Sequence, residues 1–176
     1  LLGDGCVLPR QPIHYTSNDP ANLEAVEAAA ARRFGITPRR VIQESWWHTY
    51  LPAPQHLTHG VRNPISTWWD HLGLRDCRSW QKFVPHLVHQ APLHQVQLFL
   101  RHLWATDGTI SLSASGKGPQ VRIMYATTSR QLADDVQRLL LRCGLQSRIS
   151  VVPQGRHRPS HHVRIEGVDH QRRFLE

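Results

Sequence analysis

The chain has 176 residues with 21 basic and 13 acidic side chains, and the formal net charge of +8 at pH 7 predicts a polyanionic partner. No apolar run approaches the roughly 18 residues that span a membrane, and no signal peptide opens the chain, so we expect a cytoplasmic protein with no membrane partner. The length suits one compact domain or two small halves that share a core.

The positive charge is concentrated in the second half of the chain. Residues 1–90 carry nine basic and seven acidic side chains, whereas residues 91–176 carry twelve and six. Nineteen of the basic residues are arginines, and arginine can bind phosphate or guanine through two parallel hydrogen bonds. Codon bias in a GC-rich genome would produce the same ratio of arginine to lysine.

Two helices are predicted in the first half. A capping side chain followed by proline in Ser17-Asn18-Asp19-Pro20 predicts a helix over residues 21–34, and Gly35 is its expected C-terminal stop. Asn63-Pro64 predicts the start of the next helix. Its two adjacent tryptophans are expected in the core rather than against a ligand.

The second half repeats this order with clearer strands. Residues 92–107 predict a long helix that ends at Asp107-Gly108, and Ser129 opens a helix over residues 130–143. Strands are predicted where apolar and polar residues alternate, at Val121–Tyr125, Arg148–Val152 and His162–Glu166, with a basic turn over Pro153–Pro159. Helix pairs beside antiparallel hairpins indicate an α+β class.

The order of these signals forms a weak internal repeat. Each half contains Asp-Gly, then tyrosine, then a helix with an early leucine, then a glycine twelve residues after that leucine. The members are Asp4-Gly5, Tyr15, Leu23 and Gly35 in the first half, and Asp107-Gly108, Tyr125, Leu132 and Gly144 in the second. Chance similarity of two α/β stretches is the alternative. The repeat predicts two halves, residues 1–90 and 91–176.

The two Asp-Gly pairs are the clearest chemical signal. An acidic residue at a helix C-terminus is unfavourable because it faces the negative end of the helix dipole. A divalent cation shared between the carboxylate and a DNA phosphate would supply a reason for it. Asp-Gly is also a common turn dipeptide, so either pair alone says little. Their matched places in a repeat, on a basic chain, favour the functional interpretation.

Four segments resemble the LAGLIDADG homing endonucleases that are carried inside inteins. Leu1–Gly5 resembles the end of the first motif helix, and Leu98–Gly108 resembles the second motif helix. Ser79–Pro85 is similar to the Lys-x-hydrophobic-Pro block of this family, and Tyr125–Ala133 is similar to its Thr-Ser-Arg-x-Leu-Ala block. Among such proteins, the segments resemble the endonuclease insert of an intein in a bacterial replicative DNA helicase.

The resemblance implies two pseudo-symmetric LAGLIDADG halves (αββαββα-like), whose antiparallel sheets form a saddle over the DNA major groove. It implies that Asp4 and Asp107 are catalytic and bind Mg²⁺ together with the backbone of Gly3 and Thr106, so that double-stranded DNA is cut on both strands at a long specific site. Lys82 would polarise a water or stabilise the phosphate; a solvated surface lysine is the alternative. A splicing domain of the parent intein is implied in the same polypeptide.

Candidate DNA-contacting residues lie on the expected strands and turns. A two-stranded ribbon fits the major groove, where arginine and glutamine can address guanine and adenine edges. A plain solvated charge explains any single member better than a DNA contact does, whereas the whole set is the expected electrostatic footprint of a DNA-binding surface. The set comprises Arg10, Gln11, His14, Arg39, Arg40, Lys117, Gln120, Arg122, Arg148, Arg156, His157, Arg158, His162 and Arg164.

Two departures from the family pattern leave alternatives open. The first motif helix is truncated at Leu1, and His102 stands where glycine is usual. Neither Leu1 nor Glu176 is a residue that splicing requires at an end, so this segment is not expected to splice alone. The alternatives are a catalytically inactive DNA-binding relic of an endonuclease and a LAGLIDADG-type protein that binds RNA.

Overall fold

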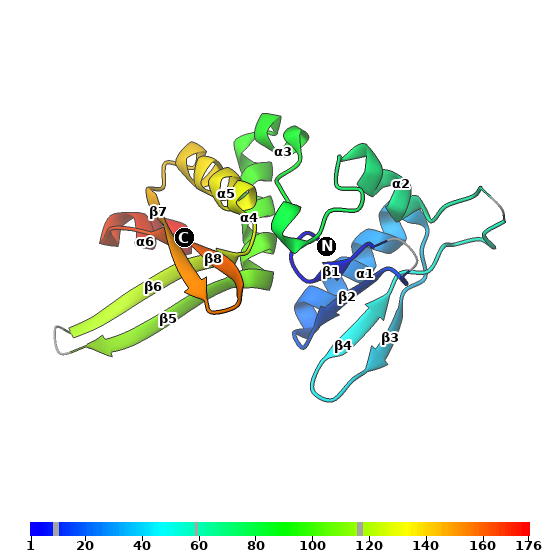
Figure 1. The fold of residues 1–176 in the computed structure, drawn as a ribbon, viewed down its shortest axis with the longest axis horizontal. Helices are drawn as coiled ribbons and strands as arrows, with labels where there is room; N and C mark the ends of the chain where they lie inside the picture. Colours follow the sequence, from blue (N-terminus) through cyan, green and yellow to red (C-terminus); the bar gives the residue numbers. More distant parts are fainter. Residues whose placement is uncertain (9–10, 59, 116–117) are drawn as a thin grey trace. The chain divides into compact units, whose positions relative to one another are not determined.

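The computed structural model describes residues 1–8, 11–58, 60–115 and 118–176, and leaves the side chains of 113–119 undescribed. The chain forms two compact units, Leu1–Cys77 and Arg78–Glu176, each with a four-stranded antiparallel sheet (Figure 1). The predicted α+β class is confirmed. The units divide after Cys77, whereas the repeat suggested a division after residue 90. No helix among the described residues is long and apolar enough to cross a membrane.

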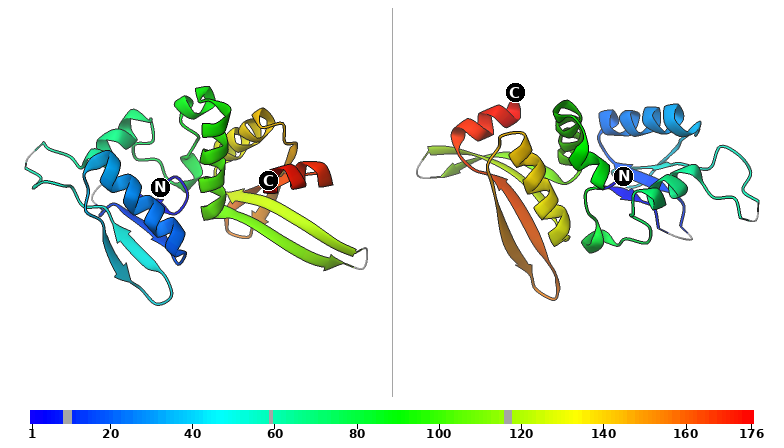
Figure 2. Two further views of the ribbon diagram at one scale, coloured as in Figure 1. Left: turned by 180° about the vertical axis from the view of Figure 1, so that it is seen from behind. Right: turned by 90° about the horizontal axis from the view of Figure 1, so that it is seen from above.

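The first unit is a small sheet with one long helix across it. Its strand order is β1-β2-β4-β3, and α1 lies across one face (Figure 2). Its elements are β1 (Gly5–Cys6), β2 (His14–Ser17), α1 (Pro20–Phe34), β3 (Arg39–Ile42), β4 (Trp47–Tyr50) and α2 (Pro64–His71).

Both helices of this unit begin as predicted. The Asp19 carboxylate accepts a hydrogen bond of 2.9 Å from the backbone N–H of Ala21 and caps α1, and Pro20 follows it. Gly35 ends α1 with a φ of 63°, a left-handed conformation that glycine adopts without steric cost. Asn63 caps α2 through Ile65 in the same way.

The core of the first unit lies between α1, α2 and the sheet. Trp69 is buried, and Trp68 packs against the core cluster, so the prediction that both tryptophans are structural is confirmed. The cluster consists of Ile13, Ala30, Ile36, Leu51 and Ile65. Apolar side chains removed from water in this way supply the main stabilisation of a small unit.

The second unit is larger and has longer strands. Its sheet order is β5-β6-β8-β7, which is the same topology as in the first unit (Figure 1). Its elements are a short 3-10 helix η1 (Ser79–Gln81), α3 (His86–Gln90), α4 (Leu93–Asp107), β5 (Gly108–Ser115), β6 (Gly118–Thr127), α5 (Arg130–Arg142), β7 (Ser147–Gln154), β8 (His157–Ile165) and α6 (Val168–Leu175).

Helix α5 is the main support of this second sheet. The Ser129 hydroxyl accepts a bond of 3.1 Å from the backbone N–H of Leu132 and caps the helix, as predicted. Gly144, with a φ of 71°, follows its C-cap. The apolar stripe at three- and four-residue spacing is buried against the sheet, and its members are Leu132, Val136, Leu139 and Leu140.

The internal repeat corresponds to equivalent core positions. Tyr15 in β2 and Tyr125 in β6 are both buried, and each pairs with the glycine of the preceding Asp-Gly. The early helix leucines, Leu23 and Leu132, are also buried in both units. Equal register and equal burial at matched positions show that the repeat is structural and not a chance likeness.

The hairpins of the second unit extend further than the sequence indicated. The turn between β7 and β8 occupies only Gly155 and Arg156, whereas a turn over Pro153–Pro159 was expected. Proline is tolerated there because β6 pairs with β8 only from His161 onward, so this end of β8 has one partner strand. The register also shifts between Val152 and Gln154.

Candidate nucleic-acid interface and carboxylate sites

The two Asp-Gly pairs occupy equivalent places in the two units. Asp107 is the last residue of α4 and Gly108 the first of β5, while Asp4 immediately precedes β1. A Cβ on Gly108 would collide with Trp104, and a Cβ on Gly5 would collide with the backbone of Leu1, in each case the residue four positions earlier. Close packing therefore requires glycine after both aspartates.

Close approach is what constrains the glycine that follows α4. The backbone of Gly108, with a φ of −85° and a ψ of 154°, is extended and open to any residue. The constraint on Gly108 is the steric one set by Trp104.

Each aspartate offers a donor set that suits a hard divalent cation. A carboxylate and a backbone carbonyl are the oxygen ligands that Mg²⁺ and Ca²⁺ prefer. The carbonyl of Thr106 belongs to the last turn of α4, where an α-helix leaves carbonyl groups without intrahelical partners. Within the described residues no group of three or more His, Cys, Asp or Glu side chains could hold a metal alone. One carboxylate per unit thus requires further oxygens from another molecule, such as a phosphate.

The segment that carries Lys82 is fastened to α5. The Ser129 hydroxyl donates a bond of 2.6 Å to the carbonyl of Lys82, and the backbone N–H of Val84 donates one of 3.0 Å to the carboxylate of Asp135. Ser129 is fully buried and Asp135 is 3% exposed, so both bonds are shielded from water. Two blocks some 50 residues apart in the chain are therefore held together, and the backbone of Lys82 has a fixed position.

One face of the second sheet is covered by helices and the other carries arginines. Ile123 and Val163 point toward the helices and are buried, so their neighbours Arg122 and Arg164 lie on the open face, as predicted. Arg164 pairs across the sheet with Met124 on one side and Arg148 on the other.

Like charges stand together on the open face of the second sheet. Arg148 and Arg164 stand directly opposite each other on β7 and β8, an arrangement that destabilises a sheet. No ion pair involves Arg122, Arg148 or Arg164 in the described part of the chain. A polyanion laid on this face would remove the repulsion.

Three buried polar atoms on the same face also lack partners within the described residues: Arg164 Nε, His162 Nδ1 and Ser150 Oγ. Buried donors and acceptors are normally hydrogen-bonded, so a polar ligand on this face would find bonding groups in these three atoms. Burial and the nearby charge of Arg164 lower the pKa of His162, which favours its neutral form.

The turn between β7 and β8 carries exposed polar side chains. Arg156 in the turn and His157 at the start of β8 are exposed. The guanidinium of Arg158 instead lies 4.1 Å from the ring centroid of Trp80, so a cation–π contact already engages it. Gln120, also exposed, pairs with Ser113 near the end of the β5–β6 hairpin.

The open face of the first sheet has a different chemistry. Cys6, His14, Tyr50 and Arg39 form one row across all four strands. Arg39 lies 5.2 Å from the ring centroid of Tyr50. The predicted residues His14 and Arg39 are thus neighbours of Tyr50, which was not among the predicted DNA contacts. The alternation in β4 (Trp47–Tyr50) was the signal that could have identified Tyr50.

Arg40 leaves the set of DNA-contacting candidates. It points to the opposite face, where its guanidinium binds the carboxylate of Glu27 on α1 through two hydrogen bonds of 2.5 and 2.9 Å. Strand alternation separates it from Arg39, and this internal ion pair accounts for its charge. Arg10 and Lys117 lie outside the described residues.

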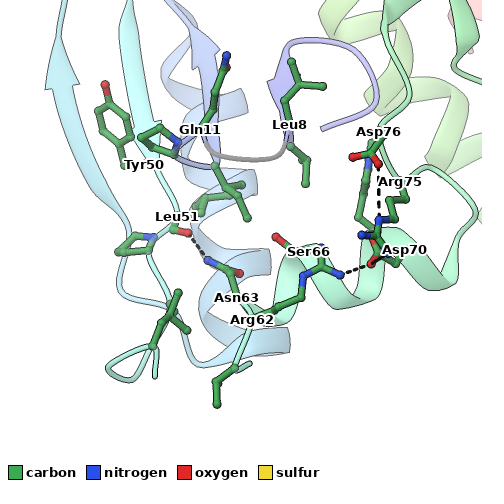
Figure 3. Close-up of a pocket in the computed structure, with 18 of the residues that line it drawn as sticks. Leu8, Gln11, Tyr50, Leu51, Arg62, Asn63, Ser66, Asp70, Arg75 and Asp76 are labelled. Carbon is green, nitrogen blue, oxygen red and sulfur yellow. Dashed lines mark hydrogen bonds and ion pairs between the residues drawn. The ribbon is translucent and has the colours of Figure 1, made fainter. Parts of the chain in front are cut away.

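A groove in the first unit begins beside Tyr50 (Figure 3). Gln11 lines it near Tyr50 and accepts a bond from the Cys6 thiol. Further along the groove, the carboxylate of Asp70 pairs with Arg62 and Arg75. These charges satisfy one another, and Arg39 and Tyr50 of the open sheet face line the same groove as Gln11.

The chain is similar to known proteins in sequence and fold. Residues 94–176 match the family model of the LAGLIDADG-like domain. The chain is 46% identical over 170 residues to the replicative DNA helicase DnaB of Nostoc sp. strain PCC 7120, covering 95% of this chain and 19% of that protein. It is 44% identical over 179 residues to DnaB of Rhodothermus marinus, covering 100% and 19%. The chain thus spans about a fifth of the length of these relatives.

A solved structure shares the fold at low sequence identity. The homing endonuclease I-DmoI in complex with DNA and Mn superposes with a TM-score of 0.58 at 10% identity, covering 96% of this chain and 83% of that one. At this identity the likeness concerns the fold. Residues 94–176 are therefore a LAGLIDADG-like domain, within a chain that has the two-sheet α+β fold of a homing endonuclease.

Proposed function

We propose that this chain is the DNA-cutting part of an intein-encoded homing endonuclease, which makes a Mg²⁺-dependent double-strand cut at a long specific site. The observation that carries the proposal is the opposed pair Arg148 and Arg164 on the open face of the second sheet, without acidic partners among the described residues. Repelling cations on a solvent-facing sheet are stabilised by a polyanion, and the width of the major groove admits a two-stranded ribbon.

The carboxylates of Asp4 and Asp107 are the proposed catalytic groups. Each would hold magnesium with a neighbouring carbonyl, that of Gly3 or of Thr106, near one scissile phosphate. Bound magnesium lowers the pKa of a water nucleophile and stabilises the developing charge on phosphate oxygens. Lys82 would contribute its positive charge to the phosphate, and the bonds from Ser129 and Asp135 hold its segment in place.

The relatives support an insert within a longer host protein. The matched region is 19% of each DnaB helicase, and it covers 95% or more of this chain. An insert of this kind would share its polypeptide with a splicing domain, and its natural DNA target would be the host gene without the insert. The structure of I-DmoI in complex with DNA and Mn supports duplex DNA and a divalent metal as ligands here.

Cleavage of plasmid DNA by the parent protein tests the proposal. A plasmid carrying the helicase gene without the insert is incubated with the parent protein and magnesium, and the ends are mapped. We expect one linear product cut at the insertion point, with no product when the metal is chelated. A parent that leaves this plasmid intact, or cuts at random positions, would contradict the proposal.

A catalytically inactive DNA-binding relic is the second candidate, and His102 favours it. This bulky side chain is exposed on α4 at a position where the family resemblance leads us to expect glycine. A relic would bind the insertion site as tightly in the absence of magnesium as in its presence, and would never cut it. Preference for structured RNA over duplex DNA in the same binding assay would indicate the RNA-binding alternative instead.

A further inference from the structure

Two stacked histidines occupy the open face of the first sheet. The rings of His14 in β2 and His48 in β4 lie 4.8 Å apart with an interplanar angle of 25°. His14 also contacts the ring of Tyr50, its direct cross-strand partner, at 5.7 Å. Packing against two aromatic rings fixes the plane of the His14 imidazole, so its ring nitrogens have defined directions.

The hydrogen-bond partners of the two rings assign their tautomers. The Nδ1 atom of His14 lies 3.0 Å from the carbonyl oxygen of Pro12. A carbonyl can only accept, so Nδ1 carries the hydrogen and Nε2 of the neutral ring is an acceptor. In His48 the corresponding acceptor is already used, because the indole N–H of Trp46 donates to its Nε2 at 3.4 Å. Within the described residues nothing bonds to Nε2 of His14.

An acceptor on this face discriminates between bases. In the major groove adenine and cytosine present amino donors, whereas guanine and thymine present oxygen or nitrogen acceptors to the same position. We propose that His14 is a specificity-determining residue for the half-site that the first sheet contacts, where its Nε2 accepts a hydrogen bond from the amino group of adenine or cytosine. This inference rests on the proposed function, in which the open sheet faces bind duplex DNA.

The proposal is tested first on the unmodified protein. Binding selection from randomised duplexes with the parent protein defines the site. The same selection with His14→Ala identifies the one position whose preference relaxes. We expect the unmodified protein to prefer adenine or cytosine there. Replacing that adenine by purine, or that cytosine by its analogue, so that in each case only the amino group is removed, should weaken binding about tenfold.

A variant with reversed hydrogen-bonding polarity provides the second test. His14→Lys offers only donors, so we expect its preference at the same position to change to guanine or thymine. His86→Gln is the matched control, because His86 is exposed at the start of α3 in the second unit and lies on neither sheet. This control should retain the preference of the unmodified protein at every position.

The possible results distinguish a failure of the His14 proposal from a failure of the proposed DNA-binding function, on which that proposal rests. A parent protein that selects no duplex sequence contradicts the proposed function. A parent that selects a site, with guanine or thymine at the position sensitive to His14, overturns the inference alone. So does equal binding of duplexes with and without the amino group at that position. The base analogues act on the unmodified protein, so the result holds even where a His14 variant folds poorly.

Discussion

The two units share a topology and differ in their surfaces. Leu1–Cys77 contains seven basic and seven acidic residues, whereas Arg78–Glu176 contains fourteen and six, so the second unit carries the whole net positive charge. The second open face presents arginines, and the first presents histidines, a tyrosine and Arg39. Matched core positions such as Tyr15 and Tyr125 remain equivalent. Packing thus constrained the interior of the repeat, while each face was free to acquire its own chemistry.

The largest expected effect tests whether the two Asp-Gly ends are equivalent. Asp107→Asn and Asp4→Asn keep the side-chain shape but remove the charge that binds metal, so each should reduce cleavage by several orders of magnitude. DNA affinity, measured in calcium, should stay within about threefold. Asp169→Asn, in the first turn of α6, is the control and should cut normally. Normal cutting by both of the first two variants would show that the matched ends are not catalytic.

The helix caps provide a second contrast between the units. Asp19 caps the exposed start of α1. The substitution Asp19→Ala should therefore lower the free energy of unfolding by about 1 kcal/mol. The buried Ser129 hydroxyl caps α5 and also binds the carbonyl of Lys82, so Ser129→Ala should cost about 2 kcal/mol or more. Denaturant unfolding of both variants measures the difference. Equal losses would mean that the bond to Lys82 contributes little.

Arg164 on the open face of the second sheet and Arg40 on the covered face of the first sheet should differ in their effect on DNA binding. Arg164→Ala should weaken DNA binding by about 1–3 kcal/mol and relax the preference at one base pair, provided that it reads a guanine. Arg40→Ala should leave base preferences intact, because Arg40 is bound to Glu27 on the covered face of the first sheet. Uniform weakening across all targets for Arg164→Ala would show that this residue holds phosphate only.

The smallest expected effect is on the stability of the fold at low pH. The folded state lowers the pKa of His162 through burial and the charge of Arg164, so the unfolded chain binds the proton more readily. The lowered pKa has no effect on stability above the ordinary histidine pKa of about 6.5. As the pH falls below that value, the unfolded chain takes up the proton first and the fold loses stability. We therefore expect His162→Gln to lose less stability than the unmodified protein between about pH 7 and 5. Melting curves that change in parallel for both proteins would exclude this role.

The sequence predicted the elements with strong local signals. Capping by Asp19, Asn63 and Ser129 located three helix starts correctly, because a cap is determined by neighbouring residues. The face that carries Arg122 and Arg164 followed from simple alternation in the strands. The family resemblance located the second motif helix, which the structure shows as α4.

Features that depend on partner strands were not predictable from the sequence. Strand alternation puts Arg39 and Arg40 on opposite faces, but only the packing of β3 beside α1 shows that Arg40 is the one that faces the helix. The tautomer of His14 depends on a carbonyl whose direction is set by the chain entering β2. The bond between Ser129 and Lys82 joins residues 47 apart, and no periodic pattern records such a contact.

The arginine-bearing face of the second sheet is expected to bind duplex DNA, and a titration of DNA affinity against salt concentration measures this binding. With about six phosphates neutralised, log affinity should fall with log salt at a slope of about −5. Changing Arg148 and Arg164 together to Ala should make the slope shallower by about 2, whereas Arg40→Ala should leave it unchanged. A slope near zero for the unmodified protein, or the same slope in the double variant, would contradict the account.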